Sequence, residues 1–186
     1  MNILVACEFS GIVREAFKKQ GHNAWSCDLL PTEIPGNHYQ CNVRDVMGMD
    51  WDMMIAFPPC RYLSNSGVRW LINNLERYNQ MLDACQFFNT LLTADIPKIV
   101  VENSIQHGYA RRFIPIYDQI IQPYQFGHGE TKATCLWLKG LPLLIPTNIV
   151  EGREARVHKE PPSPDRWKNR SRTFQGIAQA MSTQWG

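Results

Sequence analysis

Cys60 stands directly after two prolines that end a short apolar run, an arrangement that side-chain packing alone explains poorly. The run, Met53 to Phe57, is typical of a strand buried on both faces. Pro58 and Pro59 end it, because proline cannot donate to a ladder and restricts its own φ. A deprotonated thiol is a strong nucleophile, and a stiff turn limits its orientations. We therefore predict that Cys60 is a nucleophile; the alternative is a small buried filler.

Glu102 is the second residue that could take part in chemistry, because it directly follows the segment 97–101, which predicts a buried strand. Burying a carboxylate at that position costs free energy unless it is paired with another group or takes part in binding or catalysis. The carboxyl ends of parallel neighbouring strands meet at one edge of a sheet, where open α/β sheets place their sites. We therefore expect Glu102 to lie beside Cys60.

The first 28 residues predict a nucleotide-type half-site. The segments 2–6 and 23–27 predict strands, and the spacing of apolar residues at 12–20 predicts a helix between them. We expect the loop before the helix to let a ligand approach, the helix N-terminus to offer free N–H groups, and Asp28 to bind ribose hydroxyls. Gly11 stands alone in that loop, without the other glycines of a GxGxxG pattern. The alternative for Asp28 is a turn or cap residue.

The remaining pattern completes an α/β fold with one domain over residues 1–186. We expect a third strand at 39–43, with a second cofactor contact around Asn42 to Asp45, and a mobile loop at 61–70 over the pocket. A long amphipathic pattern at 71–94 predicts a helix that covers the sheet. Further elements are a possible helix at 109–117, the last two strands at 118–122 and 134–138, and a closing helix at 171–185.

Composition restricts the class of protein without naming it. The chain has 186 residues, a formal net charge of +2 and six cysteines, with neither a CxxC pair nor a spacing of cysteines and histidines typical of metal ligands. We expect a reduced cytoplasmic protein with free thiols and no metal. No apolar run is long enough to cross a membrane, and the first residues predict a strand rather than a signal peptide.

The motifs together resemble the cytosine-C5 DNA methyltransferase family, and most closely its short phage- and prophage-encoded forms. Pro58-Pro59-Cys60 is similar to the family's Pro-Pro-Cys motif, and Glu102 with the following asparagine to its Glu-Asn-Val motif. Residues 130–134, with Lys132, stand where the family carries Gln-x-Arg-x-Arg. Residues 169–186 stand where a late motif closes the cofactor site.

The resemblance implies a Rossmann-like methyltransferase fold, with a mixed, mostly parallel sheet and helices on both faces. It implies cytosine-C5 methyl transfer to DNA, with S-adenosylmethionine as the cofactor. Three residues would be catalytic: Cys60 as covalent nucleophile, Glu102 on the N3 and amino edge of the base, and Lys132 on the base O2. The residues that would bind the cofactor are Phe9, Ser10, Gly11, Asp28, Asn42 and Pro58.

The chain also departs from the family pattern. The first loop lacks a second glycine, Ser104 replaces the usual Val or Pro, and Lys132 and Thr134 replace arginines. Only 139–168, a short, irregular, proline-rich insertion, stands where longer members carry a target-recognition domain. Alternative substrates are therefore a free nucleotide such as dCMP or a single strand.

Two further hypotheses for this chain do not require methyl transfer. One is a catalytically silent module that binds DNA or a partner. The second is a cysteine hydrolase that uses His107 or His128 as its base. Basic residues gather near the C-terminus and are candidates for phosphate contacts: Arg153, Arg156, His158, Lys159, Arg166, Lys168, Arg170 and Arg172.

Overall fold

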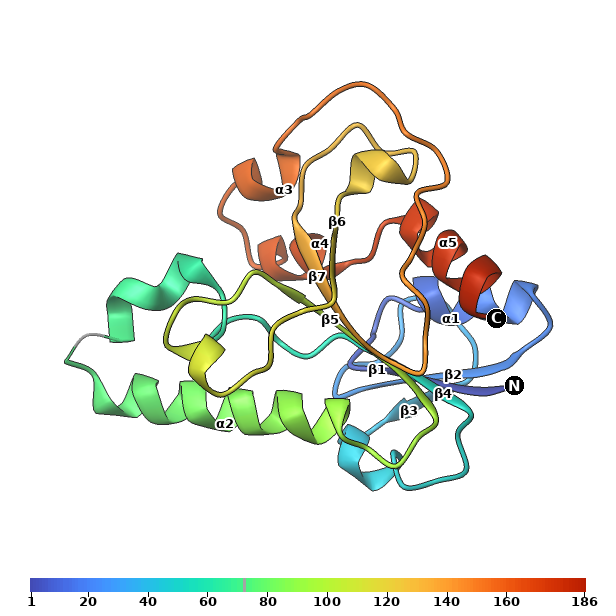
Figure 1. Cartoon of the computed structure of the whole chain (residues 1–186), viewed down its shortest axis with the longest axis horizontal. Helices are drawn as coiled ribbons and strands as arrows, with labels where there is room; N and C mark the ends of the chain where they lie inside the picture. Colours follow the sequence, from blue (N-terminus) through green and yellow to red (C-terminus); the bar gives the residue numbers. More distant parts are fainter. Residues whose placement is uncertain (72) are drawn as a thin grey trace.

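The computed structural model describes residues 1–71 and 73–186, which form one seven-stranded sheet with helices on both faces (Figure 1). The strand order is β3-β2-β1-β4-β5-β7-β6. The strands are β1 (Asn2–Ala6), β2 (Asn23–Asp28), β3 (His38–Gln40), β4 (Met53–Ala56), β5 (Lys98–Ser104), β6 (Gln119–Ile121) and β7 (Thr134–Lys139). Strands β1 to β5 pair in parallel, whereas β7 runs antiparallel to both β5 and β6.

Helices cover the two faces unequally. The long α2 (Leu75–Leu92) packs on one face through Met81, Cys85, Phe88 and Leu91. The other face is covered by α1 (Ile12–Lys19) and α5 (Gln175–Trp185), which lie side by side in Figure 1. Both faces of β1 and β4 are thus buried, and this explains their continuous apolar sequences.

The fold class is the predicted one, a mixed and mostly parallel α/β sheet. Several boundaries differ from the prediction. Strand β5 continues through Ser104 instead of ending before Glu102, because β7 pairs with it in antiparallel register as far as Ser104–Thr134. The third strand is His38–Gln40, and the long helix is Leu75–Leu92; position 72, within the predicted helix, lies outside the described residues.

Two predicted irregular or helical segments contain short 3₁₀ turns. The second half of the predicted loop at 61–70 is a 3₁₀ helix, Asn65–Leu71. The predicted helix at 109–117 is reduced to a single turn at Ala110–Arg112. Pro115 explains the early stop, because proline disfavours α geometry in the residue before it.

The segment 139–168 is mostly irregular and contains the short α3 (Arg156–Lys159) and the start of α4 (Arg166–Ser171). It lies along 125–131, to which it is joined by isolated bridges at Phe126–Asn148 and Glu130–Glu154. Among the residues that the structure describes, no helix combines the length and the apolarity needed to cross a membrane.

Candidate active site

Cys60 lies on an exposed turn directly after β4. Its carbonyl oxygen accepts hydrogen bonds from the N–H groups of Leu63 (3.0 Å) and Ser64 (2.9 Å), which close the turn. Of the six cysteines it is the one that the structure exposes, whereas Cys27, Cys85 and Cys135 are buried. The alternative of a buried filler is therefore wrong for Cys60, and the thiol is accessible to a reactant.

Asn103 ties the end of β5 to the turn that carries Cys60. Its side-chain Nδ2 donates to the carbonyl of Pro58 at 2.8 Å, in a buried setting. Strands β4 and β5 are also direct parallel neighbours, with Ala56 beside Val101. The sheet therefore brings the strand ends that carry Cys60 and Glu102 together, and the amide of Asn103 fixes their spacing.

Glu102 is half-buried near the end of β5, where burial raises its pKa above the usual value. The nearby ammonium of Lys132 and the side chain of Thr134 oppose that rise in pKa. Lys132 is close because it shortly precedes β7, whose Leu136 pairs with Glu102. The three predicted catalytic residues thus come from the ends of three adjacent strands, β4, β5 and β7.

Both histidines proposed as a hydrolase base have ring nitrogens that are bonded to backbone groups. His107 is bonded through both ring nitrogens to backbone groups of Tyr62 and Ala110. His128 accepts the N–H of Gly176 (3.0 Å), and its ring lies against Phe174. The geometry therefore gives the cysteine hydrolase hypothesis no support.

Backbone geometry and close packing both require glycine at position 11, and the predicted contact of Gly11 with the cofactor stays a prediction. Its φ is +75°, and a Cβ there would meet the guanidinium of Arg14 at 2.8 Å and Ile34 at 3.0 Å. Arg14 is fully buried and donates to the hydroxyls of Ser26 and Thr32 and to the carbonyl of Ile34. The single glycine thus lets Arg14 pin the loop at 29–38 beside β2.

Glu8 occupies the N-terminus of α1, which corrects the expectation that its N–H groups are free. Its carboxylate accepts from the N–H of Val13 (2.7 Å) and of Arg14 (3.4 Å) and from the hydroxyl of Ser10 (3.0 Å). Burial raises the pKa of Glu8, and these hydrogen bonds oppose the rise. A buried carboxylate at a helix N-terminus satisfies the donors that a phosphate would otherwise use.

Asp28 and Asn42 both act in local turns. Asp28 Oδ1 accepts the N–H of Leu30 (3.0 Å), and the Asn42 side chain accepts that of Arg44 (3.1 Å). Asp28 is half-buried at the end of β2, and burial raises its pKa. The alternative of a turn residue is thus correct for Asp28, and its ribose contact stays a prediction, as does the contact of Asn42.

Phe9 lies in a cluster that sequence reasoning missed. The ring of Trp167, on α4, lies 5.9 Å from the Phe9 ring, and the guanidinium of Arg172 lies 6.0 Å from it. Arg172 also binds both carboxylate oxygens of Glu33, at 2.9 and 2.6 Å, although 139 residues separate the two in sequence. The C-terminal segment is thus fastened over the first loop.

Two of the arginines predicted to contact phosphate are instead paired with carboxylates of the protein. Arg172 pairs with Glu33, and Arg156 pairs with the buried Glu130 and more loosely with Glu154 (3.7 Å). No spacing in the sequence indicates these pairs. For the remaining basic residues near the C-terminus, phosphate contact stays a prediction.

We expect Glu33→Gln to lower the melting temperature at neutral pH by about 2 °C. The side chain of Glu33 is 36% exposed and that of Arg172 is 33% exposed. Solvent screening therefore limits the contribution of this ion pair to the free energy of unfolding to roughly 0.5–1 kcal/mol. Arg172 lowers the pKa of Glu33, so the contribution is complete above the ordinary glutamate pKa and is lost as pH falls through the lowered value. Thermal unfolding at a series of decreasing pH values below pH 7 measures this, with Glu151→Gln as an exposed control. A difference in melting temperature between Glu33→Gln and the parent protein that does not shrink as the pH falls would contradict it.

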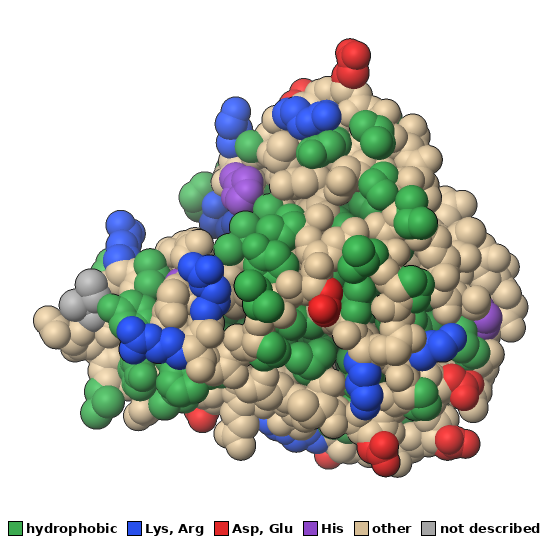
Figure 2. Space-filling model, in the orientation of Figure 1, with side chains coloured by type: hydrophobic (Ala, Val, Ile, Leu, Met, Phe, Trp, Pro, Cys, Tyr) green, Lys and Arg blue, Asp and Glu red, His purple; other side chains and the backbone are tan. Residues whose placement is uncertain are grey.

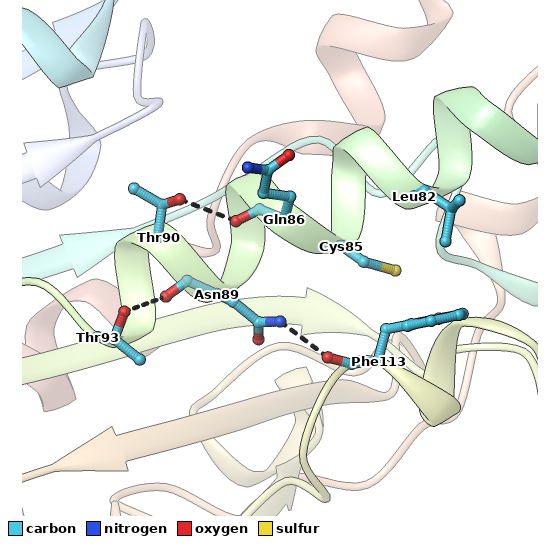
Figure 3. Close-up of a pocket in the computed structure, with 7 residues that line it drawn as sticks. All are labelled: Leu82, Cys85, Gln86, Asn89, Thr90, Thr93 and Phe113. Carbon is cyan, nitrogen blue, oxygen red and sulfur yellow. Dashed lines mark hydrogen bonds between the residues drawn. The ribbon is translucent and has the colours of Figure 1, made fainter.

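Two cavities, each of about 390 Å³, are lined by residues that do not include Cys60. In Figure 3 one lies against α2, where Asn89 donates to the carbonyl of Phe113 (2.8 Å) and Thr90 to that of Gln86 (2.9 Å). Three of its polar side chains, Asn89, Thr90 and Thr93, thus donate to backbone carbonyls of the fold. Burial raises the pKa of Cys85 to about 11. The other cavity lies between α1 and α5. Neither brings together residues that could carry the predicted chemistry.

No family model matches this chain, and no curated protein matches its sequence. Its fold is similar to that of a prophage-encoded protein from E. coli that has been assigned as a DNA modification methyltransferase, with a TM-score of 0.53 and 14% identity over 81% of this chain and 52% of that one.

Two further structures are more distant. One is the Entamoeba histolytica methyltransferase EhMeth, with a TM-score of 0.46 and 10% identity over 86% of this chain and 59% of that one. The other is a DNMT2 variant from Spodoptera frugiperda, with a TM-score of 0.41 and 17% identity over 83% and 54%. This chain therefore spans little more than half the length of each. The resemblance is confirmed at the level of the fold: the chain has the predicted α/β Rossmann-like fold, and this fold is similar to that of the E. coli protein.

Proposed function

We propose that this protein transfers a methyl group from S-adenosylmethionine to C5 of cytosine in DNA, through a covalent adduct with Cys60. The observation that carries the proposal is the bond from Asn103 to Pro58, which joins an exposed thiol to the end of the strand that bears Glu102. A nucleophile and a carboxylic acid at adjacent strand ends are the groups that this reaction needs.

The first loop fits S-adenosylmethionine better than a dinucleotide. Glu8 already fills the N-terminus of α1, so a pyrophosphate there would meet a carboxylate instead of free N–H groups. S-adenosylmethionine has no phosphate and carries a positive sulfonium. Phe9, Ser10 and Gly11 would hold it, with Asp28 on the ribose and Asn42 and Pro58 at the edges of the site. When bound, it supplies an electrophilic methyl group.

Cys60 would start the reaction by adding its thiolate to C6 of the cytosine ring. The S–C6 bond forms as the C5=C6 π bond breaks, and the electron pair makes C5 nucleophilic. After methylation, the C5 proton leaves to a base and the S–C6 bond breaks, which restores the ring and the thiolate. An exposed thiol on a closed turn suits this role because a base rotated out of its stack must reach it.

Glu102 and Lys132 would stabilise the ring as charge develops. A carboxyl whose pKa is raised stays protonated to higher pH and can donate to N3, while its other oxygen accepts from the amino group. Lys132, close enough to affect the pKa of Glu102, would contact the base O2. A lysine offers a point charge rather than the planar fork of an arginine, so this contact is weaker than in the family pattern.

The surface near Cys60 suits a polyanion. The segments 57–71 and 103–117 carry four arginines, Arg61, Arg69, Arg111 and Arg112, and no acidic residue. Figure 2 shows basic side chains at the end of the molecule where the turn at Asn65–Leu71 lies, whereas acidic side chains gather near the opposite end. Trp70, which is 56% exposed, lies against Arg69 (4.6 Å) and could stack on a base. This surface supports DNA as the partner.

Incubation with methyl-labelled S-adenosylmethionine and a panel of duplex DNA, single-stranded DNA and dCMP tests the proposal. Nucleoside analysis should find 5-methylcytosine in DNA, and no label should enter DNA in which 5-methylcytosine replaces cytosine. Product only from dCMP would favour a nucleotide substrate, which the short segment at 139–168 supports. Retention on DNA without methylation under every condition would favour the silent module.

Asp28→Ala should weaken S-adenosylmethionine binding by about 10- to 100-fold, because a ribose hydroxyl would lose a charged acceptor. DNA binding should change by less than about twofold. Calorimetry with the cofactor and fluorescence anisotropy with DNA measure the two affinities, with Asp50→Ala as an exposed control. Equal cofactor affinity in Asp28→Ala and the parent protein would refute the ribose contact.

A further inference from the structure

His107 bridges the segment after β5 and the turn that begins at Cys60. Its ring Nε2 lies 3.0 Å from the carbonyl of Tyr62, and its backbone N–H donates to the carbonyl of Leu63 at 2.9 Å. Its Nδ1 accepts the N–H of Ala110 at 3.1 Å. A single side chain and its own backbone thus hold two consecutive residues of the turn.

The partners determine the protonation of the ring. A carbonyl can only accept, so Nε2 must carry the proton that is donated to Tyr62. Nδ1 must keep a lone pair, because it accepts the N–H of Ala110. His107 is therefore the neutral Nε2–H tautomer. The residue is 2% exposed, and burial and the charge of Arg77 lower its pKa, in agreement with a neutral ring.

These bonds act on the residues that orient Cys60. The N–H groups of Leu63 and Ser64 donate to the carbonyl of Cys60, and these hydrogen bonds close the turn. His107 adds hydrogen bonds to the turn from a different segment of the chain. An isolated bridge between Ser64 and Gln106 adds a further tie between the same two segments. On the opposite side, Asn103 holds Pro58. Cys60 is therefore exposed on a turn that is held on both sides. Asn103 of β5 binds the residues before Cys60, and His107, which follows β5, binds the residues after it.

We propose that His107 is a positioning residue that fixes the turn of Cys60 for attack on the substrate. This inference rests on the proposed function, but its effect on the turn can be measured independently of methyl transfer. The ring acts as a fixed donor rather than as a base, since both of its nitrogens are engaged by the backbone. A small displacement of a nucleophile from its reactive geometry can cost about a hundredfold in rate.

Two substitutions separate the two bonds of the ring. His107→Asn can keep an acceptor near Nδ1 for Ala110 but is too short to reach Tyr62, whereas His107→Gln can place an amide donor near the position of Nε2. We expect His107→Asn to lower kcat by about 10- to 100-fold with the KM for S-adenosylmethionine unchanged. His107→Gln should restore kcat to within about threefold of the parent protein.

Hydrogen–deuterium exchange supplies the second readout. The amides of Leu63 and Ser64 should exchange faster in His107→Asn and at the parent rate in His107→Gln, with melting temperatures recorded for all three proteins. Equal exchange and equal kcat in the two variants would overturn the inference, as would faster exchange with unchanged kcat. Absence of methyl transfer in the parent protein would instead refute the proposed function, while the exchange data would still show whether His107 holds the turn.

Discussion

Replacing Cys60 with alanine or serine is expected to reduce methyl transfer by on the order of a thousandfold or more, with S-adenosylmethionine affinity unchanged. Alanine removes the nucleophile, and a serine hydroxyl is a far weaker nucleophile near neutral pH. Cys60 lies on the surface, so neither change opens a cavity in the core or lowers stability appreciably. The initial rate with labelled cofactor and calorimetry with the cofactor measure the two effects separately.

The matched control is Cys85→Ala, which also removes a thiol. Cys85 lies on α2, where it lines the cavity of Figure 3, and it has no role in the proposed reaction. It should keep most of the activity of the parent protein. A covalent complex with DNA that contains 5-fluorocytosine should form in the parent protein and in Cys85→Ala but not in Cys60→Ala. A parent-like rate in either Cys60 variant would remove the covalent mechanism.

Glu102→Gln is expected to lower kcat by about 10²- to 10³-fold, because an amide cannot supply the acidic proton that the ring requires. Burial raises the pKa of Glu102, so the protonated form persists above the usual pH range for glutamate. The parent rate should fall as pH rises through that raised pKa. The variant, which has no such group, should lose this limb of the profile.

The same residue predicts an effect on stability. Since the pKa of Glu102 is higher in the folded protein than in the unfolded chain, its contribution to stability is complete below the ordinary glutamate pKa and is lost as pH rises through the raised value. The melting temperature of Glu102→Gln relative to the parent protein should therefore be higher at pH 8 than at pH 5. A difference that is independent of pH, or a variant with parent activity, would contradict the role given to Glu102.

Much of the fold could be predicted from the sequence because strong local signals determine it. Short apolar runs bounded by polar residues, such as 3–6 and 53–57, favour strands in which both faces are buried, because successive side chains of a strand point to opposite faces. The pair of prolines before Cys60 ends its strand in any context. Parallel order then brings Cys60 and Glu102 to neighbouring strand ends, as the sheet has them. The predicted ends of strands were less accurate where pairing with a neighbouring strand determines the end. Strand β5, for example, continues to Ser104 because it pairs with the antiparallel β7.

The sequence by itself determined that an α/β sheet carries a thiol and an acid at adjacent strand ends, since hydrophobic period and proline act over a few residues. The tertiary structure decided what surrounds them. Glu8 fills a helix end that looked free, Arg172 reaches Glu33 across 139 residues, and His107 reaches Tyr62 across 45. Such contacts leave no periodic trace, because a side chain can find its partner at any separation once the fold brings the two segments together.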